Sequence, residues 1–140
     1  MAKLSVRDLD TSGKRVFVRV DFNTPLTEEG AIRDDSRIRA ALPTINHLLN
    51  NKAKVILASH LGKAKGKPDP RWTMRPVAER LSQLLGRDVI LAPDCIGPEV
   101  ARLVKEAPAG TVVLLENLRF HPGEMENDLT FARELANLAD

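Results

Sequence analysis

Four short runs of β-branched and other apolar residues, each followed by a helical pattern, constrain the fold more than any other feature of this sequence. The runs are Val16–Val20, Val55–Ala58, Val89–Ala92 and Val112–Leu115. The last three are almost continuously apolar, which is typical of strands buried on both faces of a sheet. Strands that alternate with helices form parallel sheets with right-handed crossovers. We therefore predict an α/β fold with three layers, α/β/α, around a parallel sheet.

Four segments between and after these runs carry apolar residues at helical spacing. The first helix is expected to begin near Asp35 or Ser36, the second to end at Gly86, and the last to be capped by Asn127 or Asp128. The apolar positions are Ile38, Ala41, Leu42, Ile45, Leu48 and Leu49; Val77, Leu81, Leu84 and Leu85; Val100, Leu103 and Val104; and Leu129, Ala132, Leu135, Ala136 and Leu138.

Composition excludes several classes of protein. The 140 residues are 43% hydrophobic and 29% charged, which is ordinary for a globular protein, and Cys95 is the single cysteine, so an intramolecular disulfide is impossible. The sequence has neither a run of about 20 apolar residues nor the apolar core of a signal peptide. We expect a cytoplasmic protein with no membrane partner. The net charge of +2 is too small to indicate nucleic-acid binding.

The segments that follow the four strands are polar or contain glycine. They are Asp21–Pro25, Ser59–Lys63, Pro93–Gly97 and Glu116–Gly123. In a parallel sheet the carboxyl ends of the strands share one edge, and ligands of open α/β sheets bind there. The sequence therefore predicts a ligand site formed by these segments.

Positively charged and imidazole side chains gather at this predicted edge: Arg37, His60, Lys63, Arg119 and His121. Such a set suits a small anion that carries phosphate or carboxylate, which arginine binds through two parallel hydrogen bonds. A purely structural alternative pairs Arg119 with Glu116 or Asp94. Asp21 is equally compatible with an ion pair to a nearby arginine and with a bond to a substrate hydroxyl. For Lys65, Lys67 and Arg71 a solvated loop is the favoured interpretation.

Several familiar chemistries leave no signature. The sequence contains no Walker-type loop, no G-x-G-x-x-G after a strand and no G-x-S-x-G elbow. The three histidines and Cys95 lack metal-ligand spacing, so we predict no metal site. No histidine is close to Cys95 in the sequence, and we expect this cysteine to pack inertly rather than to act as a nucleophile.

Five segments, in order and spread over the whole chain, resemble phosphoglycerate kinases. They are Arg19–Asn23, Ser36–Ile45, Ala58–Gly62, Asp94–Pro98 and Leu115–His121. The resemblance implies the amino-terminal domain, which binds 3-phosphoglycerate or 1,3-bisphosphoglycerate. Its full-length relatives transfer a phosphoryl group reversibly between 1,3-bisphosphoglycerate and ADP, giving 3-phosphoglycerate and ATP.

The resemblance also implies roles for individual residues. Asp21 and Asn23 would hold the glycerate hydroxyl end, His60 and Arg119 would bind the 3-phosphate, and Arg37 would act as the catalytic residue that stabilises the transferring phosphoryl group. The substrate-binding set implied by the matching segments is Asp21, Phe22, Asn23, Arg37, His60, Leu61, Gly62, Lys63 and Arg119. The reaction needs no general base because its acceptor is a carboxylate, so Asp21 would orient the substrate.

The chain departs from the family inside this set. The family usually has Arg-Pro after His-Leu-Gly, whereas this chain has Lys63 and Ala64. Lysine keeps the positive charge and lacks the planar fork of arginine. We expect the phosphate contact at Lys63 to survive in a weaker and less fixed form.

The resemblance covers about the first third of the family's length. Residues 1–140 would be an incomplete amino-terminal domain with four of six strands, in the order 3-4-2-1, and with the first strand at an unpaired edge. The carboxy-terminal domain, which carries the Mg-ADP or Mg-ATP site, would be absent. We expect this segment to bind no cofactor and to be inactive alone, and the full-length enzyme to be monomeric. The alternative is a non-catalytic module that binds small anions; nucleic-acid binding through Lys63–Arg75 is disfavoured because aromatic residues are few.

Overall fold

Four parallel strands form the single sheet of the computed structural model, which describes residues 9–64, 66–121 and 128–140. The strands are β1 (Arg15–Arg19), β2 (Lys54–Ala58), β3 (Val89–Leu91) and β4 (Val112–Leu114). Their order across the sheet is β1-β2-β4-β3, and every pairing is parallel. The predicted parallel sheet, its strand order and the edge position of β1 are therefore confirmed.

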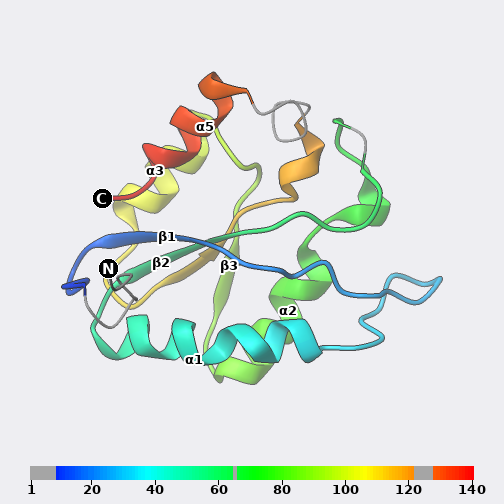
Figure 1. Cartoon of the computed structure of the whole chain (residues 1–140), viewed down its shortest axis with the longest axis horizontal. Coiled ribbons are helices and arrows are strands. Elements are labelled where there is room, and N and C mark those ends of the chain that lie inside the picture. Colours follow the sequence, from blue (N-terminus) through cyan, green and yellow to red (C-terminus); the bar gives the residue numbers. More distant parts are fainter. Residues whose placement is uncertain (1–8, 65, 122–127) are drawn as a thin grey trace, which may run out of the picture.

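Helices cover both faces of this sheet (Figure 1). Helices α1 (Ser36–Asn50) and α2 (Arg75–Leu85) lie on one side, and α3 (Pro98–Glu106) and α5 (Leu129–Ala136) lie on the other. Two short 3-10 helices, η2 (Pro70–Trp72) and η3 (Leu118–Phe120), belong to the loops after β2 and β4. The three-layer prediction is confirmed. Within the described residues no helix is long and apolar enough to cross a membrane.

Alternation along the central strands divides the interior into two cores. In β2, Val55 and Leu57 pack with α1 and α2, whereas Ile56 and Ala58 pack with residues of α3 and α5. Successive side chains of a strand point to opposite faces, so a strand covered on both sides must be apolar throughout. This explains the continuous apolar run in β2 and in β4.

Helix boundaries follow the predicted signals with one refinement. Gly86 ends α2 with a φ of 69°, and the Asp128 carboxylate accepts hydrogen bonds from the backbone N–H groups of Thr130 and Phe131. Asn127, the alternative cap, lies outside the described residues. Asp35 precedes α1 as predicted, yet its carboxylate makes no capping bond and binds arginine side chains instead.

Two expectations about burial are wrong. Ile90 of β3 is 37% exposed, because β3 lies at an edge of the sheet and pairs with β4 alone among the described strands. Leu129 is 71% exposed, and the side chains that α5 and the following turn bury are those of Phe131 and Leu138. Phe131 lies on the opposite side of the helix from Leu129, so the face that meets the sheet begins at Phe131.

Candidate anion-binding site at the strand ends

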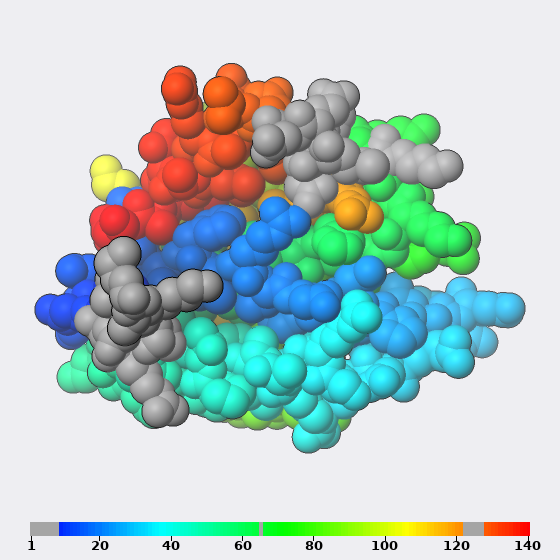
Figure 2. Space-filling model, viewed as in Figure 1, coloured from blue at the N-terminus to red at the C-terminus, as the bar shows by residue number. Residues whose placement is uncertain are grey.

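The segments that follow β1, β2 and β4 lie together at the carboxyl edge of the sheet, on the right of Figure 1. The segment of residues 24–32 projects from this edge, with the green segment after β2 above it (Figure 2). A single antiparallel bridge between Leu26 and Ile32 holds the projection closed. The sheet topology thus brings the predicted site segments to one end of the molecule.

Asn23 links two of the predicted residues. Its side-chain oxygen accepts a hydrogen bond of 2.8 Å from the Gly62 backbone N–H, and its backbone carbonyl accepts one of 2.6 Å from Arg37 Nη1. Asn23, Arg37, Gly62 and Lys63 line one cavity of about 620 Å³, together with Trp72 and residues of the projecting segment. Four of the predicted site residues therefore share one concave surface.

Asp21 and Arg37 form an ion pair at the rim, with 3.4 Å between Oδ1 and Nη1. The same oxygen accepts a hydrogen bond from the Asn23 backbone N–H. The side chains are 66% and 52% exposed, and ion pairs this open contribute little to stability. The ion-pair interpretation of Asp21 is observed. To turn toward an anionic ligand, Arg37 must break this weak pair and also its hydrogen bond to the Asn23 carbonyl.

Phe22 and Leu61 support the site from the hydrophobic core. Both side chains are fully buried in the core, so neither presents side-chain atoms to the cavity. The Phe22 backbone N–H donates to Ser59 Oγ over 3.0 Å, which ties the loop after β1 to the loop after β2. Any contribution of these two residues to binding therefore acts through packing and the main chain.

Gly62 is required by its surroundings. Its φ of 62° lies in the left-handed region, and a Cβ at this position would stand 2.0 Å from the Trp72 ring. The ring therefore packs directly on the Gly62 backbone. Arg71 lies over the same indole at 5.0 Å from the centroid, a cation–π arrangement.

His60 and Arg119, the predicted phosphate ligands, are both half-buried. Arg119 is fixed through its main chain, because its N–H donates to Asn117 Oδ1 and its carbonyl accepts from the Gly66 N–H. The Glu116 carboxylate accepts hydrogen bonds from Thr73 Oγ1 and the Met74 N–H, each 2.7 Å long. Glu116 therefore anchors the start of α2.

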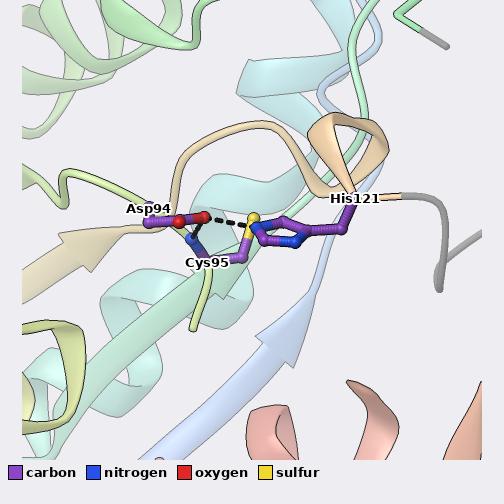
Figure 3. Close-up of side chains that lie close together, drawn as sticks. All are labelled: Asp94, Cys95 and His121. Carbon is purple, nitrogen blue, oxygen red and sulfur yellow. Dashed lines mark hydrogen bonds and ion pairs between the residues drawn. The ribbon is translucent and has the colours of Figure 1, made fainter. Parts of the chain in front are cut away.

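His121 lies beside Cys95 in space, although no histidine is close to this cysteine in the sequence (Figure 3). Sequence separation concealed the proximity, because β3 and β4 are neighbours and the residues that follow them meet. Donor atoms of Asp94, Cys95 and His121 lie within 4.8 Å of one another, a spacing from which they could ligate a cation, so the argument from sequence spacing against a metal site does not hold.

Each of these three side chains already has a hydrogen-bond partner within the protein. His121 Nε2 and Asp94 Oδ1 are 2.5 Å apart, and the Cys95 thiol donates to the Glu116 carbonyl over 2.8 Å. Cys95 is fully buried. This surrounding favours the packing role for Cys95, and its sulfur serves to join the loops after β3 and β4.

The basic run after Lys63 is consistent with the predicted solvated loop at Lys67 and Arg71, both of which are exposed. Lys65 and the last two residues of the Glu116–Gly123 segment, 122 and 123, lie outside the described residues.

Two carboxylates at the start of α1 are held in the charged form. Hydrogen bonds from Arg39 and Arg80 lower the pKa of Asp35 below its ordinary value. Hydrogen bonds from the Ser36 hydroxyl and backbone lower the pKa of Asp34. Arg37 therefore follows two stable negative charges, which offset part of the positive charge at the site.

Sequence reasoning missed Ser59, Trp72 and Asn117 as components of this site. Each lies next to a predicted ligand or contacts one through a loop, but none carries charge. One available signal was a polar residue directly after a fully apolar strand, a position that Ser59 occupies. Asn117 gives no such signal, because Leu115 and Glu116 lie between it and β4.

Comparison with known proteins identifies the family. A family model described as phosphoglycerate kinase matches residues 6–140. The phosphoglycerate kinase of Anaeromyxobacter sp. (strain K) is 62% identical over 142 residues, which cover 100% of this chain and 36% of that protein. The phosphoglycerate kinase of Aquifex aeolicus (strain VF5) is 56% identical over 140 residues, which cover 100% of this chain and 35% of that protein.

Solved structures agree with this assignment. The phosphoglycerate kinase from Coxiella burnetii superposes with a TM-score of 0.82 at 36% identity, covering 98% of this chain and 33% of that one. The enzyme from Pyrococcus horikoshii OT3 gives a TM-score of 0.81 at 34% identity, covering 96% and 34%. The chain thus spans about a third of the length of its relatives. Because the family model matches nearly the whole of it, the chain belongs to the phosphoglycerate kinase family.

Proposed function

We propose that this chain carries the phosphoglycerate-binding part of a phosphoglycerate kinase. The whole protein would transfer a phosphoryl group reversibly between 1,3-bisphosphoglycerate and ADP, in the cytoplasm, as a step of glycolysis. The observation that carries the proposal is the shared cavity of Asn23, Arg37, Gly62 and Lys63, in which one asparagine hydrogen-bonds both to the arginine and to the glycine loop.

The residues divide the work by their chemistry. His60 and Arg119 would bind the 3-phosphate, with Lys63 as a further cation, while Asp21 and Asn23 would orient the glycerate hydroxyl end. Arg37 would stabilise the transferring phosphoryl group, because phosphoryl transfer depends chiefly on positioning and on neutralising charge. The acceptor is already a carboxylate, so no group here needs to remove a proton.

The nucleotide is assigned to the part of the protein beyond these residues. No glycine-rich phosphate cradle follows a strand in this sequence, and the relatives are nearly three times as long. When bound there, Mg-ADP or Mg-ATP would supply the other phosphoryl partner. The 140 residues alone should therefore show no turnover with 1,3-bisphosphoglycerate and ADP, and measurable turnover would contradict this division.

Binding is tested with 3-phosphoglycerate on the chain itself. The single tryptophan, Trp72, lines the same cavity, so its fluorescence should change on titration, and backbone amide shifts should move near Asn23 and Gly62. Arg37→Gln should weaken the affinity about tenfold, as expected on losing one charge-assisted contact. Arg102→Gln on α3 is the matched control, since it removes the same charge from the opposite face of the sheet.

The second candidate function is a non-catalytic module for small anions, favoured by the exposed cations at the rim. Inorganic phosphate and glycerate serve as competing probes. If phosphate binds as tightly as 3-phosphoglycerate and Arg37→Gln weakens both equally, the anion module replaces the substrate site. Absence of any response at millimolar 3-phosphoglycerate would overturn both functions for this chain.

A further inference from the structure

One buried amide stands at the centre of the strand-end loops. Asn117 lies three positions beyond the end of β4, its residue is fully buried, and its side chain makes four hydrogen bonds. An amide offers two donors on nitrogen and two lone pairs on oxygen. All of this capacity is used, and every partner is a backbone group of a loop at the site.

Two of the four bonds go to a single residue. Asn117 Oδ1 accepts from the Leu61 N–H over 3.2 Å, and Nδ2 donates to the Leu61 carbonyl over 2.8 Å. The side chain therefore pairs with Leu61 as a neighbouring strand would. Leu61 lies between His60 and Gly62, and its own side chain is fully buried. The rotation of both flanking peptides is fixed by this pairing.

The remaining bonds fix the opposite loop and the cavity wall. Asn117 Oδ1 also accepts from the Arg119 N–H over 3.0 Å, at the start of η3. Nδ2 donates to the Trp72 carbonyl over 2.9 Å, and the Trp72 ring packs on Gly62. A further backbone bond, from the Leu118 N–H to the Ser59 carbonyl, joins the same two loops.

We propose that Asn117 is a positioning residue that sets His60 and Arg119 relative to each other for binding of the substrate phosphate. The two predicted ligands come from different loops, and the same amide oxygen bonds to Arg119 itself and to the neighbour of His60. Misplacing a binding group by about 1 Å costs up to about a hundredfold. The identity of the ligand in this inference rests on the proposed function. The ordering of the loops by Asn117 rests on the hydrogen bonds alone.

The test separates positioning from general stability. Asn117→Ala removes all four bonds, and Asn117→Asp keeps the acceptor oxygen while removing the donor that faces Leu61 and Trp72. Val104→Ala truncates a buried side chain on α3, on the opposite face of the sheet from α1 and α2, and serves as the control with a comparable fall in Tm. If Asn117→Ala does not fold, Asn117→Asp carries the test, because its shape is unchanged.

Amide hydrogen exchange is the first measurement. Exchange at Leu61 and Arg119 should accelerate at least about tenfold in Asn117→Ala relative to Val104→Ala at the same distance below Tm, because local opening no longer requires unfolding of the sheet. Asn117→Asp should protect the Arg119 amide better than Asn117→Ala. Equal exchange at both amides in the alanine variant and in the control overturns the positioning role, whatever the ligand.

The second measurement is the affinity for 3-phosphoglycerate, determined by amide-shift titration. Both Asn117 variants should bind at least about tenfold more weakly than the parent at temperatures where all are folded, whereas Val104→Ala stays within about twofold. Equal affinities in all variants overturn the inference while the proposed function stands. If the parent itself does not bind, the proposed function fails, and the exchange data alone decide whether Asn117 orders the loops.

Discussion

The two sides of the candidate site are built on different physical principles. The loops after β2 and β4 are joined through the buried side chain of Asn117 and the carboxylate of Glu116. The loop after β1 and the start of α1 are joined at the rim by the exposed Asp21–Arg37 pair. Buried networks that are fully satisfied hold one geometry, whereas exposed ion pairs exchange partners at little cost. One side is thus held in one geometry, whereas on the other side the exposed Arg37 side chain can exchange its partners when a ligand arrives.

The largest effect is expected from Gly62→Ala on the side held in one geometry. The added methyl group would meet the Trp72 ring at 2.0 Å on a backbone of positive φ, and the two penalties together should lower the free energy of unfolding by about 2–5 kcal/mol. Chemical denaturation measures this change.

Gly86→Ala is the control for that substitution. Gly86 has a similar φ of 69° and open space where its Cβ would lie, so only the backbone penalty of about 1–2 kcal/mol should remain. Equal losses at Gly62 and Gly86 would show that the contact with Trp72 contributes nothing.

Glu116→Gln should have the next largest effect. The Gln side chain has one oxygen in place of two, so either the Thr73 hydroxyl or the Met74 N–H at the start of α2 faces an NH₂ group. The free energy of unfolding should fall by about 1–3 kcal/mol. Glu79→Gln, on the exposed face of α2, should change it by less than about 0.5 kcal/mol in the same thermal melts.

Asp35→Asn tests the ion pairs at the start of α1 through the pH dependence of the melting temperature. Because hydrogen bonds from Arg39 and Arg80 lower the folded-state pKa of Asp35, its contribution is fully present above the ordinary pKa of an aspartate, about 4. The contribution is lost as the pH falls through the lowered folded-state value. The parent should therefore melt above Asp35→Asn at neutral pH, and the difference should vanish in acid; a difference independent of pH would contradict the assignment.

Lys63→Arg is expected to give the smallest effect, and on binding rather than on stability. Lys63 is exposed at the cavity, so the folded state should be indifferent to the exchange. The planar fork of arginine should raise the affinity for 3-phosphoglycerate a few-fold. Lys67→Arg is the control on the same loop. An equal gain in affinity there would show that the effect is not specific to a contact at position 63.

Sequence reasoning predicted the fold because its signals are local. Apolar runs such as Val55–Ala58 and end signals such as Gly86 are properties of a few adjacent residues, and the position of the site follows from the parallel sheet. The roles of Asn117 and Trp72 and the proximity of Cys95 to His121 depend on which loops meet in space. No pattern within a single segment encodes such meetings.

The exposure of Leu129 and Ile90 likewise depends on which elements meet in space, which local sequence patterns do not encode. Periodicity shows that a segment has an apolar face, but the neighbouring elements decide how much of that face is covered.

The contact between Asp140 and Arg15 has a consequence for the time course of folding. Asp140 bonds to Arg15 through both backbone and side chain, closing over the beginning of β1 across 125 positions of sequence. Contacts between residues so far apart form late, since the long intervening loop must first be ordered. During synthesis the start of β1 must wait until every other described strand and helix has left the ribosome before this contact can form.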